Sequence, residues 1–132
     1  MLFTSSRALI LFTAAVLVMP GCGGSATTTG APSAPSSPNA VVITIASGNV
    51  SPKNVIVPAG SQITFVNNDT VDHLMYSDPH PEHTDCPDIN AVGFLTPGQS
   101  RQTGNLNVVR TCWFHDHGNP TVASLRGTIT IQ

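Results

Sequence analysis

The chain has few charged residues: five of its 132 residues are Lys or Arg and seven are Asp or Glu, for a formal net charge of −2. A nucleic-acid-binding surface needs a cluster of basic side chains, so this composition excludes that class of partner. The sequence also lacks a Ser/His/Asp arrangement, a phosphate-binding glycine loop and an HExxH motif. We therefore expect a protein that is not an enzyme.

The N-terminal apolar run is too short for the roughly 20 residues that a membrane-spanning helix requires. It covers Ala8–Val18, follows a single charge at Arg7 and has the length of the apolar part of a secretory signal peptide. The segment Met19–Cys22 resembles the lipobox of bacterial lipoproteins, in which the cysteine is acylated. The sequence thus predicts a signal peptide over residues 1–21, cleaved before Cys22, and a lipid on Cys22 that anchors the protein to a membrane.

The next segment, residues 22–40, is rich in Pro, Ser, Thr and Gly and carries too little apolar surface to fold. We expect it to be a flexible tether. Residues 41–132 then provide enough chain for one domain with a single core. Together these features predict a domain exported to the bacterial cell envelope and held by lipid on the periplasmic or extracellular face of a membrane.

The folded part shows alternation of apolar residues and repeated turn signals, without a convincing helical stripe. This pattern predicts an all-β fold, an antiparallel Greek-key β-sandwich or barrel of 7–8 strands. Long loops are expected over residues 77–90 and 116–124. The expected strands include Val41–Ala46, Asn54–Val57, Ser61–Asn67, Val71–Tyr76, Gln99–Leu106, Val108–His115 and Gly127–Gln132.

All five histidines fall in two groups beside these two loops. The first group is His73, His80 and His83, and the second is His115 and His117. Loops at one end of a sandwich lie close together, so the two groups are expected to converge. Imidazole nitrogens bind copper, zinc and nickel, and histidine is largely neutral near pH 7. The sequence therefore predicts a metal site at one end of the fold.

Four segments of the folded part resemble the cupredoxin family: Pro52–Gly60, Ile63–His73, Leu95–Gly98 and Leu125–Ile129. The resemblance covers most of residues 41–132 and implies a copper-binding sandwich. In this family the histidine that follows the Asn-rich turn is a copper ligand, and that role falls on His73.

The cysteines leave two readings open. The spacing from Cys112 to His115 resembles that of a blue-copper thiolate and its neighbouring histidine. Counting back from Leu125, however, places Asp116 at the usual thiolate position. If Cys22 carries lipid, Cys86 and Cys112 remain as a pair in an oxidising compartment, and a disulfide between them is favoured.

Two further motifs, Asp78–Thr84 and Phe114–Pro120, resemble a His-rich bacterial subgroup of cupredoxin-like proteins. We predict copper as the cofactor, with zinc as a less favoured occupant, and the metal ion, the membrane and a redox or copper-trafficking protein as partners. The favoured function is copper capture, delivery or tolerance at the envelope. The alternatives are blue-copper electron transfer through Cys112 and a metal-free structural or interaction module. The predicted ligands are His73, His80 and His117, with His83, His115, Asp116 and Cys112 as alternates.

Overall fold

The computed structural model describes residues 40–132. The predicted signal peptide, most of the tether and the lipidated Cys22 lie outside the described residues, and those assignments stay predictions. No helix in the described part is long and apolar enough to cross a bilayer. The strands are β1 (Val41–Ala46), β2 (Asn49–Ser51), β3 (Asn54–Val57), β4 (Ile63–Asn67), β5 (His73–Ser77), β6 (Gly93–Leu95), β7 (Ser100–Gln102), β8 (Arg110–Asp116) and β9 (Arg126–Ile131), with 3₁₀ helices η1 (Pro87–Ala91) and η2 (Ala123–Leu125).

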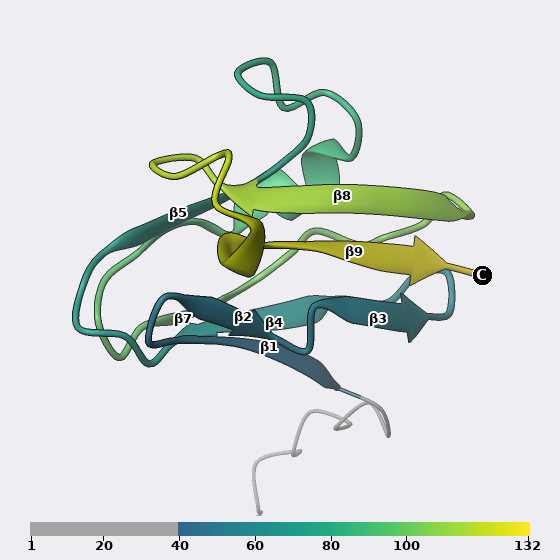
Figure 1. Ribbon diagram of the computed structural model, residues 1–132. Coiled ribbons are helices and arrows are strands. Elements are labelled where there is room, and N and C mark those ends of the chain that lie inside the picture. Colours follow the sequence, from purple (N-terminus) through teal and green to yellow (C-terminus); the bar gives the residue numbers. More distant parts are fainter. Residues whose placement is uncertain (1–39) are drawn as a thin grey trace, which may run out of the picture. The chain divides into compact units, whose positions relative to one another are not determined.

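The strands form two sheets that pack face to face (Figure 1). One sheet has the order β2-β1-β4-β7 and the other has the order β3-β9-β8-β5-β6. The predicted all-β sandwich is confirmed. Nine strands are present rather than seven or eight, because β2 and β6 are three-residue strands with too little alternation to stand out in the sequence. The pairs β1–β4 and β3–β9 are parallel, so both sheets are mixed.

The core lies between the sheets and follows the alternation of the strands. In β4 the buried positions include Ile63 and Phe65, and in β8 they include Cys112 and Phe114. The rings of Phe65 and Phe114 meet edge to face across the two sheets, with centroids 5.2 Å apart. Such a contact adds about 1 kcal/mol to the burial of the two rings.

Two segments outside the strands carry three of the five histidines, and a fourth, His115, lies near the end of β8, just before the second segment. The first, called here the His loop, is residues 78–85, between β5 and η1. It begins where the amide of Asp78 donates to the carbonyl of Trp113 on β8, and it closes where the amide of Asp85 donates to the carbonyl of Asp78. The second segment follows β8 and leads into η2. The β5–β8 register pairs the last residues of β5 (Met75–Ser77) with the last residues of β8 (Phe114–Asp116), so both segments leave the five-stranded sheet beside this short overlap.

Candidate metal centre

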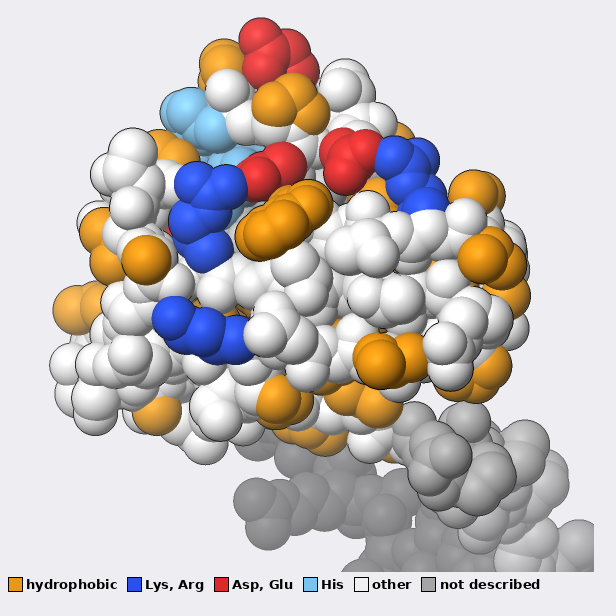
Figure 2. Space-filling view, turned by 45° about the vertical axis from the view of Figure 1, so that its right-hand side comes forward, with side chains coloured by type: hydrophobic (Ala, Val, Ile, Leu, Met, Phe, Trp, Pro, Cys, Tyr) orange, Lys and Arg blue, Asp and Glu red, His pale blue; other side chains and the backbone are white. Residues whose placement is uncertain are grey.

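Four histidines bring their ring nitrogens together: His80 and His83 from the His loop, His115 from the end of β8, and His117 directly after it. One nitrogen from each ring lies within 4.8 Å of the others. Ligands on opposite sides of one ion, each at about 2.0 Å, are about 4 Å apart. Small side-chain movements therefore suffice for all four nitrogens to bind a single metal ion. Histidine side chains are seen together near acidic and basic ones on the surface in Figure 2.

Strand alternation places this group on the outer face of the five-stranded sheet, opposite the core. Phe114 points into the core, so its neighbours Trp113 and His115 point outward. Trp113 is half exposed, as expected for an outer-face residue, whereas His115 is completely buried. His115 is buried because the His loop lies against it: the rings of His80 and His83 are centred 5.5 and 5.2 Å from its ring.

His115 is held by a carboxylate. Its Nδ1 lies 2.5 Å from Oδ1 of Asp78, and Oδ2 of Asp78 accepts a hydrogen bond of 2.6 Å from Arg126. The other ring nitrogen, Nε2, is buried and has no hydrogen-bond partner among the described residues. A buried polar atom without a partner is costly, and such atoms in native proteins commonly mark a functional position. Nε2 of His115 is therefore the atom in this group that most needs a ligand.

His83 is fixed from three sides. Its backbone has a φ of 55°, a left-handed conformation that is uncommon outside glycine. Its amide donates to the carbonyl of Pro79 at 2.7 Å, its carbonyl accepts from Ser77 and Asn90, and its ring Nδ1 lies 2.8 Å from the carbonyl of Ser77. Because a carbonyl can only accept, Nδ1 of His83 carries the proton and Nε2 of the neutral ring presents its lone pair.

The lone pair of His83 is directed at His117, whose Nδ1 lies 2.9 Å from Nε2 of His83. His117 is itself anchored, because its amide donates to the carbonyl of Leu74 at 2.7 Å. Tyr76 packs beside both rings, with centroids 4.6 Å from His83 and 5.6 Å from His117. His80 is the exposed member of the group, between two prolines. The group therefore has three fixed rings and one at the solvent side.

Burial also shapes the electrostatics of the group. It lowers the pKa of His115 below its usual value, an effect that the nearby Asp78 carboxylate only partly opposes. A neutral imidazole is the form that binds metal ions. His115 is thus kept in its metal-binding form to a lower pH than an exposed histidine.

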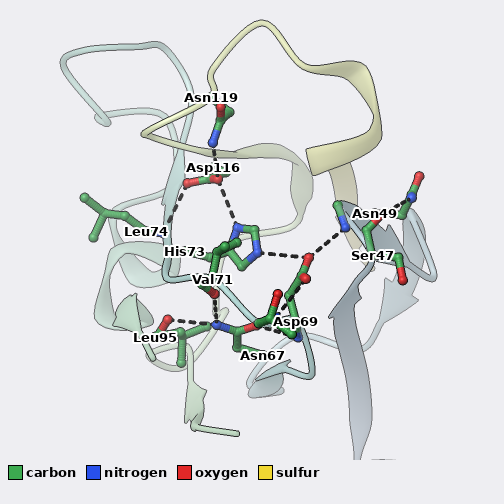
Figure 3. Close-up of polar contacts among 12 residues, drawn as sticks. Ser47, Asn49, Asn67, Asp69, Val71, His73, Leu74, Leu95, Asp116 and Asn119 are labelled. Atoms are coloured by element: carbon green, nitrogen blue, oxygen red, sulfur yellow. Dashed lines mark hydrogen bonds and ion pairs between the residues drawn. The ribbon is translucent and has the colours of Figure 1, made fainter. Parts of the chain in front are cut away.

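His73 takes no part in this group. It lies on β5 and is buried. Its Nδ1 is 3.0 Å from Oδ2 of Asp116, and its Nε2, which makes no hydrogen bond among the described residues, is 3.5 Å from Oδ2 of Asp69 (Figure 3). Asp116 also accepts hydrogen bonds from the amide of Leu74 and from the side chain of Asn119. Although burial by itself raises the pKa of Asp116, its hydrogen bonds with Asn119, His73 and the backbone lower it overall, so this carboxyl is ionised.

The two cysteines of the domain form a disulfide. Cys86, just before η1, is bonded to Cys112 on β8, with 26 residues of separation. The predicted pairing is confirmed. Cys112 therefore has no thiolate to offer a metal ion, and its sulfur lies on the core side of β8 rather than on the face of the histidines.

The structure brings together some of the predicted ligands and not others. Of the three preferred residues, His80 and His117 are in the group and His73 is outside it. The alternates His83 and His115 are in the group as well. His115 and Asp116 are neighbours on β8 and point to opposite faces of the sheet, as strand alternation requires. Sequence reasoning missed Asp78 as the partner of His115, because nothing in the spacing shows which carboxylate of the His loop turns toward that ring.

Comparisons with known proteins support the fold. No protein-family model and no curated protein matches the chain. Among solved structures, a purple cupredoxin from Nitrosopumilus maritimus has a TM-score of 0.54 at 20% identity, covering 70% of this chain and 99% of its own. An amicyanin variant in its Cu(I) form has a TM-score of 0.57 at 17% identity, covering 70% of this chain and 82% of its own. An oxidised plastocyanin from Dryopteris crassirhizoma has a TM-score of 0.55 at 17% identity, covering 70% of this chain and 100% of its own. The described domain therefore has the cupredoxin fold.

Proposed function

We propose that the protein binds copper through His80, His83, His115 and His117. The observation that carries this proposal is the convergence of four imidazoles, one of which has a buried and unpartnered Nε2. Imidazole ligands suit copper and zinc, and copper(II) binds nitrogen sites more tightly than zinc does. The cupredoxin fold supports copper as the occupant, because the similar structures include an amicyanin in its Cu(I) form.

The position that the cupredoxin resemblance implied for copper does not fit a blue-copper centre. Cys112 is held in a disulfide, and Nδ1 of His73 already contacts the carboxylate of Asp116. A blue centre requires a cysteine thiolate beside two histidines. His73 has neither a thiolate nor a second histidine beside it, so the proposed copper site does not include it.

A thiolate-free site suits capture, delivery or tolerance of copper better than rapid electron transfer. The exposed ring of His80 offers a route by which an ion enters or leaves, while the other three rings remain fixed. The predicted signal peptide and lipid on Cys22 would place this site at the cell envelope, where it would bind metal ions before they reach the cytoplasm. Export and anchoring are part of the proposal and rest on the sequence alone.

Copper titration of the purified protein against a competing chelator tests the proposal. We expect one Cu(II) per chain, with paramagnetic resonance spectra dominated by nitrogen ligands and without an intense blue charge-transfer band. The double variant His83→Ala/His117→Ala should weaken binding by more than roughly 100-fold. His73→Gln is the comparison, since it removes a histidine outside the group, and it should keep one copper when circular dichroism shows it folded. Absence of copper binding by the wild-type protein would refute the proposal.

A further inference from the structure

Asp78 links two side chains that belong to different strands. Its Oδ1 lies 2.5 Å from Nδ1 of His115 on β8, and its Oδ2 accepts from Nη2 of Arg126 on β9 at 2.6 Å. His115 and Arg126 face one another in the β8–β9 register. The carboxylate of Asp78 therefore contacts both residues of one β8–β9 pair. Asp78 is also the first residue of the His loop.

Arg126 is itself restrained. Its Nη1 donates to the carbonyl of Pro120 at 2.9 Å, in the segment that follows His117. A continuous chain of contacts thus runs from the segment after β8, through Arg126 and Asp78, to His115. It ties the segment after β8 to the His loop and to His115 on β8, and it leaves the Asp78 carboxylate little freedom to turn away.

The carboxylate of Asp78 determines which ring nitrogen of His115 carries the proton. An ionised carboxylate only accepts hydrogen bonds, so Nδ1 of His115 must be the protonated nitrogen of the neutral ring. The lone pair is then on Nε2, the atom that is buried and without a partner among residues 40–132. Metal-binding histidines commonly donate their second ring nitrogen to a carboxylate in this way, and the carboxylate sets both the tautomer and the ring orientation.

We propose that Asp78 is a positioning residue for the four-histidine site: held by Arg126, it keeps the lone pair of His115 on Nε2 and thereby sets the affinity of the site for Cu(II). The effect on Cu(II) affinity rests on the proposed copper function. The tautomer of His115, in contrast, can be measured in the metal-free protein. The two parts can therefore be tested separately.

The chain offers a matched control at the other end of the His loop. Asp85 also pairs with an arginine of the sheet, Arg110 on β8, and both partners are partly exposed, as are Asp78 and Arg126. Asp85 makes no contact with a histidine among the described hydrogen bonds and ion pairs. Asp85→Ala thus removes an equivalent charge and an equivalent ion pair from the same loop without touching His115.

The first experiment reads the tautomer in metal-free protein by long-range ¹H–¹⁵N correlation of the histidine rings. We expect wild type and Asp85→Ala to show His115 protonated at Nδ1, and Asp78→Ala to show a mixture with protonation at Nε2. Asp78→Asn retains an acceptor oxygen and should keep the wild-type tautomer. A role limited to loop stability would leave the His115 signals unchanged in every folded variant.

The second experiment measures Cu(II) affinity by chelator competition. Asp78→Ala should bind copper about 10- to 100-fold more weakly than wild type. Asp78→Asn should lie between the two, and Asp85→Ala should stay within about twofold. Arg126→Gln should produce a smaller loss than Asp78→Ala, because it loosens the carboxylate without removing it.

Each outcome decides one part. If wild type binds copper and Asp78→Ala binds it equally well, Asp78 does not set the affinity and the inference is overturned. If His115 is protonated at Nε2 in the wild-type protein, the tautomer assignment fails regardless of copper. If no protein binds copper but the tautomers follow the expected order, the proposed function fails while the positioning of His115 by Asp78 stands. Should Asp78→Ala not fold, Asp78→Asn and Arg126→Gln decide by copper affinity: both should bind copper more weakly than wild type and Asp85→Ala, and affinities equal to that of wild type would overturn the inference.

Discussion

Nδ1 of His73 lies 3.0 Å from Oδ2 of Asp116, and this pair occupies the two positions at which the cupredoxin resemblance places a copper-binding histidine and a thiolate. The carboxylate accepts hydrogen bonds from the ring, from two backbone amides and from Asn119. These bonds connect β5 to the turn that carries His117. A hydrogen-bonded carboxylate here stabilises the turn, and the four-histidine group lies on the other face of β8.

The first prediction concerns this carboxylate. Asp116→Ala leaves four donors without an acceptor, and one of these donors is the buried ring of His73. We expect a loss of about 3 kcal/mol in the free energy of unfolding, measured by urea denaturation. Asp72→Ala, an exposed carboxylate one residue before β5, should change it by less than about 0.5 kcal/mol. Equal stability of the two variants would show that the network around Asp116 contributes little.

The sequence predicts the sandwich because the alternation of apolar and polar residues along each strand indicates which side chains are buried. It also predicts the disulfide, because the expected export would leave Cys86 and Cys112 as a pair in an oxidising compartment. It does not reveal that His73 lies outside the group formed by the other four histidines. The resemblance favours His73 as a ligand because of its position after the Asn-rich turn, but that position shows only where the histidine lies along the chain. In the structure, Nδ1 of His73 is occupied by the carboxylate of Asp116, which the β5–β8 register pairs with Met75.

The second prediction concerns close packing at Gly127 on β9. A Cβ built there would overlap the carbonyl oxygen of Lys53 and lie 2.5 Å from Cζ of Phe114. Gly127→Ala must push β3 or the core ring aside, which should cost about 3 kcal/mol. At Gly118 an added Cβ meets its nearest neighbour, Oδ1 of Asp116, at an ordinary 3.7 Å. Gly118→Ala should therefore leave the thermal midpoint nearly unchanged, and an equal fall for both variants would contradict this account.

The third prediction concerns pH and follows from the lowered pKa of His115. The folded protein binds this proton less readily than the unfolded chain, whose histidines titrate near about 6.5. The associated stability is therefore fully present above about pH 6.5 and is lost as pH falls through the lower pKa of the folded state. Urea midpoints of metal-free protein should decline over that range. His115→Gln should show a shallower decline, and an unchanged slope in that variant would exclude His115 as the source.

The last prediction separates the disulfide from the metal group. The bond between Cys86 and Cys112 closes a loop of 26 residues, which corresponds to about 3 kcal/mol of stabilisation in the chain-entropy model. The double variant Cys86→Ser/Cys112→Ser should lose about this much, because the unfolded chain is no longer constrained. Its copper stoichiometry should remain one, since the four imidazoles supply the ligands and neither sulfur lies in their group. The His loop begins eight residues before Cys86, so a moderate fall in affinity from greater loop freedom is compatible with this account. Complete loss of copper in the folded double variant, or an intense blue band on reducing the wild-type protein, would instead make Cys112 a ligand.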